Sequence, residues 1–437
     1  MADQSAPGGL LRTVRRGDLV LLVINAIIGA GIFGLPGEVF GRIGVYSLLA
    51  FAACALAVTL IILCFAEVGS RFTGTGGPYL YAREAFGPFV GFEVGWMIWI
   101  ARLAAFAANC NLLIAYFSVF VPAAGAGTGR IVAICLVVLV LTLVNVVGMR
   151  DATNVSNVLT IAKLAPLLLF IGAGAFFIEP ARFVQAAPPA FGAFSVSVLL
   201  LVYAFTGFEM AVIPGGELKD PQRDLPRALL IAIAVVAVIY ISVQVVAIGT
   251  LPSLAGAARP LADAAGRMVG PVGASIIAGG AVVSILGNLN VTVMAAPRLL
   301  FAMAERGELP GVLGAAHRRF HTPHVAVVFT AVIVLALTLS GTFVYAATIS
   351  AIARLLGYGA TCIALVVLRR RPAASPPRFV TPAGVVVAGV AVLLIVWLLS
   401  NITMPQARDA AIAAAVGLVV YRAMPWGRGP SRMSDHE

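Results

Sequence analysis

The sequence contains little charge. Of its 437 residues, only 11% are Asp, Glu, Lys or Arg, whereas 61% are hydrophobic. Soluble domains carry about 25% charged and about 45–50% apolar residues. This composition therefore excludes an ordinary soluble enzyme and a disordered chain. The length leaves room for roughly a dozen apolar stretches of about 20 residues each, which is the span of the hydrocarbon core of a bilayer.

Cysteine and histidine are also scarce, and their pattern indicates no metal site. The five cysteines lie in apolar runs without a CxxC spacing, so we expect neither disulfides nor zinc ligands. We expect each cysteine to be a small buried residue. They are Cys54, Cys64, Cys110, Cys135 and Cys362. Three of the four histidines fall in the segment His317–His324, which is basic and lacks cysteine and acidic residues. We therefore expect no bound metal, and no motif indicates a cofactor.

Basic residues outnumber acidic ones, 29 to 18, which gives a net charge of +11. In a soluble protein this excess would suggest a nucleic-acid partner. Cytoplasmic loops of membrane proteins collect Lys and Arg, so the membrane explains the excess and no nucleic acid is expected. Residues 1–17 are polar and basic, and no small-residue cleavage site follows them. They are expected to form a retained cytoplasmic tail.

Twelve apolar segments are long enough, by length and flanking residues, to predict an all-α integral membrane protein with 12 transmembrane helices. The ninth and twelfth segments are the shortest. The segments are 18–41, 45–69, 89–121, 131–148, 155–178, 194–214, 225–250, 272–304, 325–340, 345–368, 384–400 and 410–421.

The distribution of basic residues agrees with this count. With the N-terminus inside the cell, 20 of the 29 basic residues fall on the cytoplasmic side and six outside. Arg102, Lys163 and Arg354 remain within the membrane. One segment more or fewer would scramble the pattern, so both termini are predicted to be cytoplasmic.

Two of the segments are interrupted by glycine and proline. The first contains NAIIGAGIFGLPG at Asn25–Gly37, and the sixth contains LVYAFTGFEM at Leu201–Met210. Glycine weakens a helix and proline removes a backbone donor, so both helices are predicted to break near their middles. Interruptions at corresponding positions of two five-helix halves indicate an inverted repeat of the kind found in secondary transporters.

An alternative is that these glycines only allow close packing of helices, as small residues do in membranes. Gly29 and Gly31 do not have the spacing of a GxxxG motif, although Gly37 and Gly41 do. The pattern favours a broken-helix site over packing alone.

Several motifs occur in one order along the chain. They are IGAGIFGLP at Ile28–Pro36, TGGPYLYAREAFG at Thr75–Gly87, FTGFE at Phe205–Glu209, ELKDP at Glu217–Pro221, the loop Arg298–Pro310 and Arg319–Pro323. With these motifs the sequence resembles the amino acid, polyamine and organocation (APC) transporter superfamily through the tenth segment. The resemblance implies alternating access and an amino acid or related amine as substrate.

The resemblance also implies a leucine-transporter-like fold. Its first five-helix repeat would span 18–178 and its second, inverted repeat 194–368. Two extra helices would occupy 384–421, followed by a cytoplasmic tail at 422–437.

The break in the first segment offers both parts of a site for a zwitterion. The N–H groups of Ala30, Gly31 and Ile32, at the start of the second half-helix, present a partial positive charge to a carboxylate. Carbonyls at the end of the first half-helix, at Ile27 and the next residue, are unpaired and would face an ammonium group. Gly29 and Gly31 let the backbone approach the ligand.

The resemblance places the rest of the site in the sixth segment. Carbonyls near Tyr203 and Thr206, next to Gly207, would complete the ammonium site, and Tyr203 would close over the substrate. The alternative is that Tyr203 is a membrane tyrosine whose hydroxyl is satisfied by a neighbouring helix.

Lys163 lies inside the fifth segment, roughly 12 Å from its cytoplasmic end. An ionisable group at such a depth is a functional hypothesis by default. Lysine at this position resembles the proton-coupled members of the superfamily, but it also occurs in exchangers. The alternative is a lysine whose long stem reaches the cytoplasmic interface.

Arg102 is expected to face the substrate cavity. Because arginine stays charged, it needs a partner, either a substrate carboxylate, which would favour acidic substrates, or a protein acid such as Glu209. Glu209 is predicted either to relay protons or to neutralise Arg102. Arg354 is expected to serve the structure, by bonding carbonyls of the broken helix.

Four asparagines, Asn109 and Asn111 in the third segment and Asn288 and Asn290 in the eighth, are polar enough to line a path. Amide side chains also hold membrane helices together, and that role is favoured for each.

The sequence therefore predicts a secondary active transporter that imports an amino acid by proton symport across a bacterial plasma (inner) membrane. Its partners would be the amino acid, a proton and membrane lipids, which the basic run Arg369–Arg371 would contact.

One alternative is an exchanger of amino acids or of an amino acid and an amine. Another is a sensor that binds an amino acid without moving it, although the short tails leave no room for a signalling domain. An enzyme is not expected, because no acid, base and nucleophile lie at one depth. The substrate's identity and the oligomeric state do not follow from the sequence.

Overall fold

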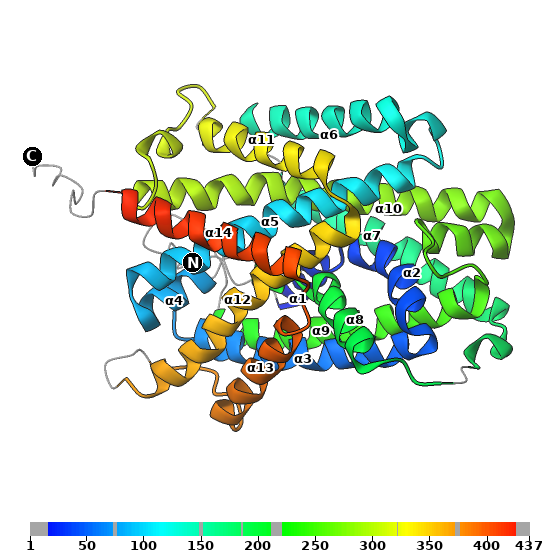
Figure 1. The fold of residues 1–437 in the computed structure, drawn as a ribbon, viewed down its shortest axis with the longest axis horizontal. Helices are drawn as coiled ribbons and strands as arrows, with labels where there is room; N and C mark the ends of the chain where they lie inside the picture. Colours follow the sequence, from blue (N-terminus) through cyan, green and yellow to red (C-terminus); the bar gives the residue numbers. More distant parts are fainter. Residues whose placement is uncertain are drawn as a thin grey trace, which may run out of the picture.

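The structure, a computed structural model, describes residues 16–72, 77–147, 152–184, 187–210, 221–320, 322–371 and 376–424. Within these ranges every regular element is a helix, which confirms the predicted all-α class (Figure 1). Most of both predicted tails and the 217–220 part of one motif lie outside the described residues.

The helices follow the predicted segments. In the first half of the chain they are α1 (Arg16–Ile27), α2 (Gly31–Ile43), α3 (Ser47–Gly69), α4 (Pro78–Phe86), α5 (Pro88–Phe117), α6 (Gly127–Val147) and α7 (Ala152–Gly174). In the second half they are α8 (Phe191–Phe205), α9 (Pro221–Thr250), α10 (Pro260–Glu305), α11 (His324–Ser340), α12 (Phe343–Arg369), α13 (Gly384–Leu399) and α14 (Met404–Ala423). Short 3-10 turns join several of them, including η5 (Phe208–Met210).

Six helical stretches in the described part of the chain are long and apolar enough to cross a membrane, and α13 with α14, bent by 118°, would add a seventh. The apolar helices α8 and α11 are shorter, with 15 and 17 residues. A helix of that length covers at most about 26 Å, less than the roughly 30 Å hydrocarbon core. The count of twelve crossings therefore stays a prediction.

The backbone of α10 is broken inside its bounds, since Val269 and Gly270 are non-helical and the glycine has φ +74°. The predicted eighth segment, 272–304, matches the longer part of α10 that follows this kink, and residues 260–268 form a shorter helical part before it. The start of the last helix differs from the prediction. α14 begins at Met404, six residues before the apolar run, since Thr403 and the residue three positions into the helix form a capping box.

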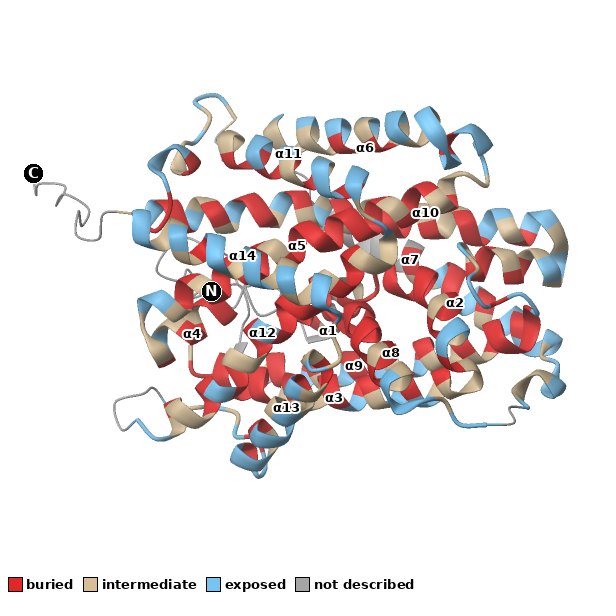
Figure 2. Cartoon of the chain, viewed as in Figure 1, coloured by how far each residue is buried: buried red, intermediate tan, exposed pale blue. Residues whose placement is uncertain are grey.

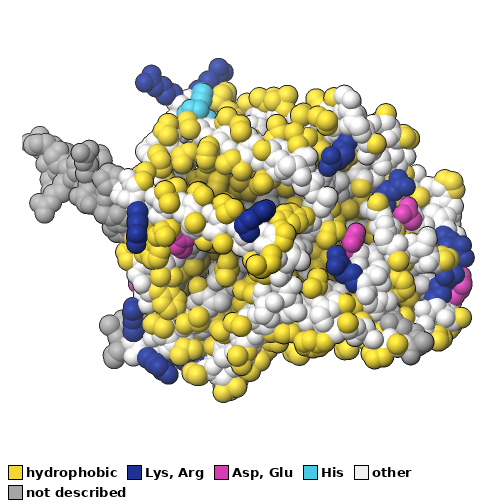
Figure 3. All heavy atoms as spheres, in the orientation of Figure 1, with side chains coloured by type: hydrophobic (Ala, Val, Ile, Leu, Met, Phe, Trp, Pro, Cys, Tyr) yellow, Lys and Arg dark blue, Asp and Glu magenta, His cyan; other side chains and the backbone are white. Residues whose placement is uncertain are grey.

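The core lies where α5 and α12 pack against each other, with α10 against α5, α3 and α8 against α12, and α9 against α3. In the most apolar window of α5, 89% of the residues are buried, compared with 17% in α6. Figure 2 shows this contrast between the buried centre and the exposed α6 and α11 edge, where these two helices pack together. Hydrophobic side chains also cover much of the visible surface (Figure 3). Such large exposed apolar areas indicate a surface that faces lipid.

A buried carboxylate near the end of α3 joins three parts of the chain. Glu67 accepts hydrogen bonds from Arg369 Nε at 2.7 Å and Nη2 at 2.6 Å, and from the Thr381 N–H at 2.8 Å. Arg71 lies 3.6 Å from the same carboxylate. Because Glu67 is fully buried, its charge is tolerated only with these partners, which fix the ends of α3 and α12 to the segment before α13.

We expect Arg369→Met to destabilise the protein by about 3 kcal/mol, because it removes the bidentate partner of a buried carboxylate. The matched control is Arg408→Met, which breaks the exposed pair with Asp409 and should cost less than about 1 kcal/mol. The apparent melting temperature in detergent measures both. Equal melting temperatures for the two variants would contradict the assigned role of Glu67.

Candidate functional site

The first predicted segment is broken, as expected. α1 ends at Ile27, α2 begins at Gly31, and residues 28–30 between them are not helical. The N–H groups of Phe33 and Gly34 both donate to the Ala30 carbonyl, at 3.0 and 3.2 Å. Among the described residues, the N–H groups of Gly31 and Ile32 have no hydrogen-bond acceptor. The start of α2 therefore presents free donors, the arrangement that favours an anion.

The second predicted break lies directly against the first. α8 ends at Phe205, and Gly207 has φ +115° before η5 begins. A Cβ on Gly207 would lie 2.1 Å from the Ala26 carbonyl oxygen at the end of α1. A Cβ on Gly31 would lie 2.7 Å from Ala204 Cα in α8. The two interruptions thus cross at backbone contact, which only glycine allows. Residues 211–214, the remainder of the predicted sixth segment, lie outside the described residues.

A tyrosine that the sequence analysis did not single out links the two breaks. The Tyr240 hydroxyl in α9 lies 3.3 Å from the Ile27 carbonyl and 3.1 Å from the Ala204 carbonyl. The prediction that the Ile27 carbonyl is unpaired is therefore wrong, because this hydroxyl reaches it. Tyr240 lies in a mostly apolar run, and no local signal in the sequence sets it apart.

A chain of polar side chains borders the first break. The Tyr203 hydroxyl donates to Asn109 Oδ1, and Asn109 Nδ2 donates to Asn288 Oδ1 at 2.9 Å. Asn288 in turn lies beside Gly29, where a Cβ would be 2.8 Å from its amide nitrogen. The chain connects α8, α5 and α10 to the break. Asn109 and Asn288 hold helices together, as predicted for them, and they also line the break.

Tyr203 is buried and takes part in two further contacts. Its ring meets Phe343 edge to face, with centroids 6.1 Å apart, so an aromatic pair covers the break on this side. The Thr206 hydroxyl donates to the Tyr203 carbonyl at 2.9 Å, which occupies one of the carbonyls expected to face an ammonium group. The hydrogen bond from the Tyr203 hydroxyl to Asn109 of α5 agrees with the alternative, in which a neighbouring helix satisfies this hydroxyl. The gating role stays a prediction.

Glu209 has a different main partner from the one expected. Its carboxylate forms an ion pair with Arg354 Nη1 and accepts hydrogen bonds from the Tyr358 hydroxyl at 2.7 Å and the Gly207 N–H at 2.9 Å. Arg354 therefore serves the structure, as predicted, but through an acid rather than through helix carbonyls. The acid lies two residues after the second break, so the pair fixes that break to α12.

Arg102 lies near this ion pair, but Arg354 rather than Arg102 binds the Glu209 carboxylate. Its Nη1 donates to the Ala295 carbonyl in α10 at 3.3 Å. The charges of Glu209 and Arg354 both act on it, with opposite signs. The expectation of a direct Arg102–Glu209 pair is thus replaced by a shared cluster in which Arg354 holds the carboxylate.

Lys163 is buried in α7 with only 4% of its side chain exposed. It lies 11 residues from the start of α7 at Ala152, roughly 16 Å along the axis. α7 packs against α10, α9 and α1. In the part of the chain that the structure describes, Lys163 forms no ion pair. Its burial does not fit a lysine that extends to the interface.

The other two asparagines join helices away from the break. Asn111 donates to the Ala107 carbonyl at 2.9 Å and accepts from Arg130. Asn290 accepts from Asn145 at 3.0 Å, which fastens α6 to α10. Both contacts agree with the favoured structural role.

Comparison with known proteins decides the family. A family model described as amino acid permease matches residues 18–421. The chain belongs to the amino acid permease family.

Three relatives come from Bacillus subtilis. This permease is 27% identical to the branched-chain amino acid permease BcaP over 96% of its own length and 94% of the relative's. It is 28% identical to a methylthioribose transporter, over 96% and 95% of the two chains. It is 31% identical to the serine/threonine exchanger SteT, over 70% and 72%.

These matches confirm the resemblance drawn from the motifs. The permease is a multi-pass membrane protein of a transporter family and not an enzyme.

We expect Glu209 to be coupled more strongly to Arg354 than to Arg102. Double-mutant cycles with Glu209→Gln, Arg354→Gln and Arg102→Gln, read from apparent melting temperatures, measure both couplings. Removing one member of the buried pair alone should cost about 3–5 kcal/mol, and removing both should cost less than the sum. A larger coupling between Glu209 and Arg102 would contradict the geometry.

Proposed function

We propose that this permease imports an amino acid by proton symport through alternating access. The observation that carries the proposal is the pair of crossed helix breaks, at 28–30 and at 206–207, buried in the centre of the helices. Discontinuous helices supply free backbone donors and acceptors inside a membrane protein, where polar groups are otherwise costly.

The two ends of the first break suit the two charges of an amino acid. The carboxylate binds the N–H groups of Gly31 and Ile32 at the start of α2. The ammonium group binds the Ile28 carbonyl, which accepts no hydrogen bond among the described residues. The amides of Asn109 and Asn288 lie beside this position and contact the rest of the substrate.

A neutral side chain suits the site better than an acidic one. The charge of Arg102 is already engaged by the Ala295 carbonyl and the field of Glu209, and Glu209 is neutralised by Arg354. Glu209 is therefore not available to a substrate side chain, and Arg102 already has a partner within the protein. Two relatives are named for branched-chain amino acids and for serine and threonine, whose side chains are also neutral.

Closure over the substrate involves the aromatic pair of Tyr203 and Phe343. Phe343 contacts α2 at Gly34, where a Cβ would lie 2.6 Å from the ring. Because the residues around the break are buried, substrate entry requires that this cover move away. The cycle then tilts α1 and α8 to open the other side.

Lys163 is the coupling group. Its ammonium lies at membrane depth without an acidic partner among the described residues, so the neutral amine is favoured by desolvation and the ammonium by an open, hydrated path. Protonation on one side and release on the other would link proton movement to the conformational cycle. Glu209, held by Arg354 and Tyr358, has a positioning role.

The proposed arrangement has 12 transmembrane helices in two inverted five-helix repeats plus two, with both termini in the cytoplasm of a bacterium and the protein in its inner membrane. The second candidate function is amino acid exchange, favoured by the match to a serine/threonine exchanger. Proteoliposomes distinguish the two, because an exchanger requires internal substrate and ignores a pH gradient.

Lys163→Ala should abolish the stimulation of uptake by an inward proton gradient, because the variant has no amine to protonate at that depth. Uptake of labelled leucine, serine and threonine into proteoliposomes, with and without the gradient, measures the effect. Exchange of internal for external substrate should persist. The exposed Arg408→Ala is the control. An unchanged response to the gradient in Lys163→Ala would show that the coupling group lies elsewhere.

Gly31→Ala should weaken substrate binding by about 1–3 kcal/mol, because its Cβ forces α2 away from Ala204. That is roughly a five- to 150-fold rise in Kd, and Gly31→Leu should bind no measurable substrate. Gly172→Ala, where a Cβ meets nothing within 4 Å, should bind as the unmodified protein does. Thermal shift against a panel of amino acids identifies the ligand first. Normal binding by Gly31→Leu would place the carboxylate site elsewhere.

A further inference from the structure

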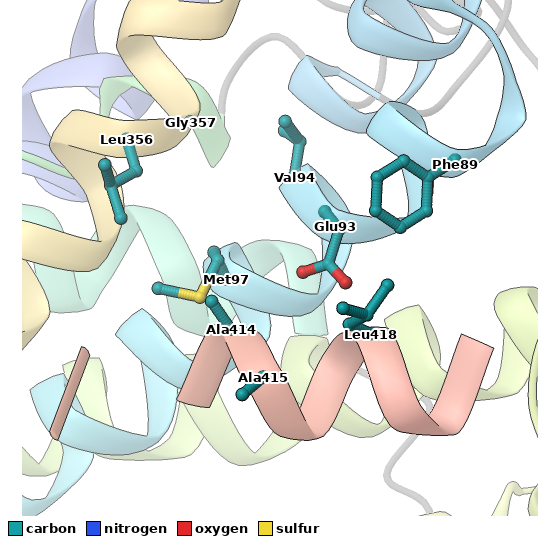
Figure 4. A pocket seen from close by; sticks show the side chains of 9 residues that line it. All are labelled: Phe89, Glu93, Val94, Met97, Leu356, Gly357, Ala414, Ala415 and Leu418. Atoms are coloured by element: carbon teal, nitrogen blue, oxygen red, sulfur yellow. The ribbon is translucent and has the colours of Figure 1, made fainter. Parts of the chain in front are cut away.

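A cavity of about 400 Å³ lies between α5, α12 and α14, apart from the helix breaks (Figure 4). Its size falls in the range of small-molecule sites, roughly 300–1,000 Å³. Apart from one carboxylate, its wall is apolar. The lining residues are Phe89, Glu93, Val94, Met97, Leu356, Gly357, Ala414, Ala415 and Leu418.

The carboxylate of Glu93 is the polar group of this cavity. Its Oε1 atom is buried and has no hydrogen-bond partner in the described part of the chain. Its Oε2 atom lies against the backbone of α14, where a Cβ on Gly417 would be 2.9 Å away. A carboxylate among apolar side chains is costly unless a cation or a proton accompanies it. A ligand with a cationic hydrogen-bond donor on an apolar body would satisfy both the carboxylate and the apolar wall.

Specific contacts join α5 to α14 on either side of the cavity. Trp96 Nε1 in α5 donates to the Ala413 carbonyl in α14 at 2.8 Å. Closer to the start of α5, the rings of Phe89 and Tyr421 pack with centroids 5.1 Å apart. Because both contacts join α5 to α14, the space between them is part of the fold rather than a gap that can collapse.

The cavity is reached from the surface that faces lipid. Phe89 and Leu356, on its rim, are 41% and 42% exposed. Glu93 lies five residues from the start of α5 at Pro88, roughly 7.5 Å along the axis. That depth corresponds to the boundary between lipid headgroups and acyl chains, where interfacial segments bury about 5–10 Å. A ligand that enters here comes from the bilayer.

We propose that this cavity binds an aminophospholipid with an ethanolamine headgroup. The primary ammonium donates to Glu93, and one acyl chain lies against Met97, Leu356 and Ala414. A choline headgroup has no N–H to donate, and an anionic glycerol headgroup brings no positive charge to the carboxylate. The site is independent of the transported substrate and of the coupling assigned to Lys163.

Native mass spectrometry of the full-length protein, with dioleoyl phosphatidylethanolamine, phosphatidylcholine or phosphatidylglycerol added in turn, tests the proposal. We expect the unmodified protein to retain one ethanolamine lipid several-fold more than either of the others. Glu93→Gln should lose this preference. Ala415→Leu, which fills the cavity and keeps the carboxylate, should lose it as well. The exposed Glu84→Gln is the matched control and should behave as the unmodified protein does.

Equal retention of the three lipids by the unmodified protein, or retention of the ethanolamine lipid by both Glu93→Gln and Ala415→Leu, would overturn the proposal. Binding of dodecylammonium without displacement by the phospholipid would instead assign the cavity to a single-chain amine. Melting temperatures in phosphatidylcholine nanodiscs establish that each variant is folded. If Glu93→Gln does not fold, Ala415→Leu decides the question alone.

Discussion

The structure depends on one constraint: each backbone group freed by a helix break inside the membrane must find a partner or serve a ligand. The two helix breaks lie against each other and together satisfy this constraint. Gly207 lets its chain touch the Ala26 carbonyl, Gly31 lets α2 touch α8, and the Tyr240 hydroxyl reaches a carbonyl from each half. Among the described residues, the Ile28 carbonyl and the N–H groups at the start of α2 keep no partner. The proposed site for a charged, compact ligand lies at these groups.

Buried charge follows the same rule. Glu209 and Glu67 each bind an arginine from α12 together with neutral donors. These clusters fasten α12 to the second break and to the end of α3. Lys163 and Glu93 differ, because neither forms an ion pair among the described residues. Groups of that kind, with an unmet charge at membrane depth, are where exchange with a proton or with lipid is expected.

Much of this site could be predicted from the sequence, because its signals are local. Glycine at 29, 31 and 207 marks breaks in otherwise continuous apolar runs, and the chain does leave the helix at both places. Lys163 and Arg354 stand out as charges in apolar surroundings. Tyr240 could not be found this way, since a tyrosine in an apolar helix looks the same whether or not it bridges two carbonyls. The partner of Glu209 was also out of reach, because Arg102 and Arg354 are equally charged and sequence distance does not rank them.

By itself the sequence determined the class of the protein, its membrane residence and the places where two helices break, because composition and hydrophobic runs respond to the bilayer directly. Only the tertiary structure decided which groups meet there. Three features depend on which helix faces lie in contact. They are the pairing of Glu209 with Arg354 rather than Arg102, the contact of Gly207 with Ala26, and the cavity beside Glu93. Those contacts are set by packing among helices distant in the sequence, and no residue's neighbours along the chain record them.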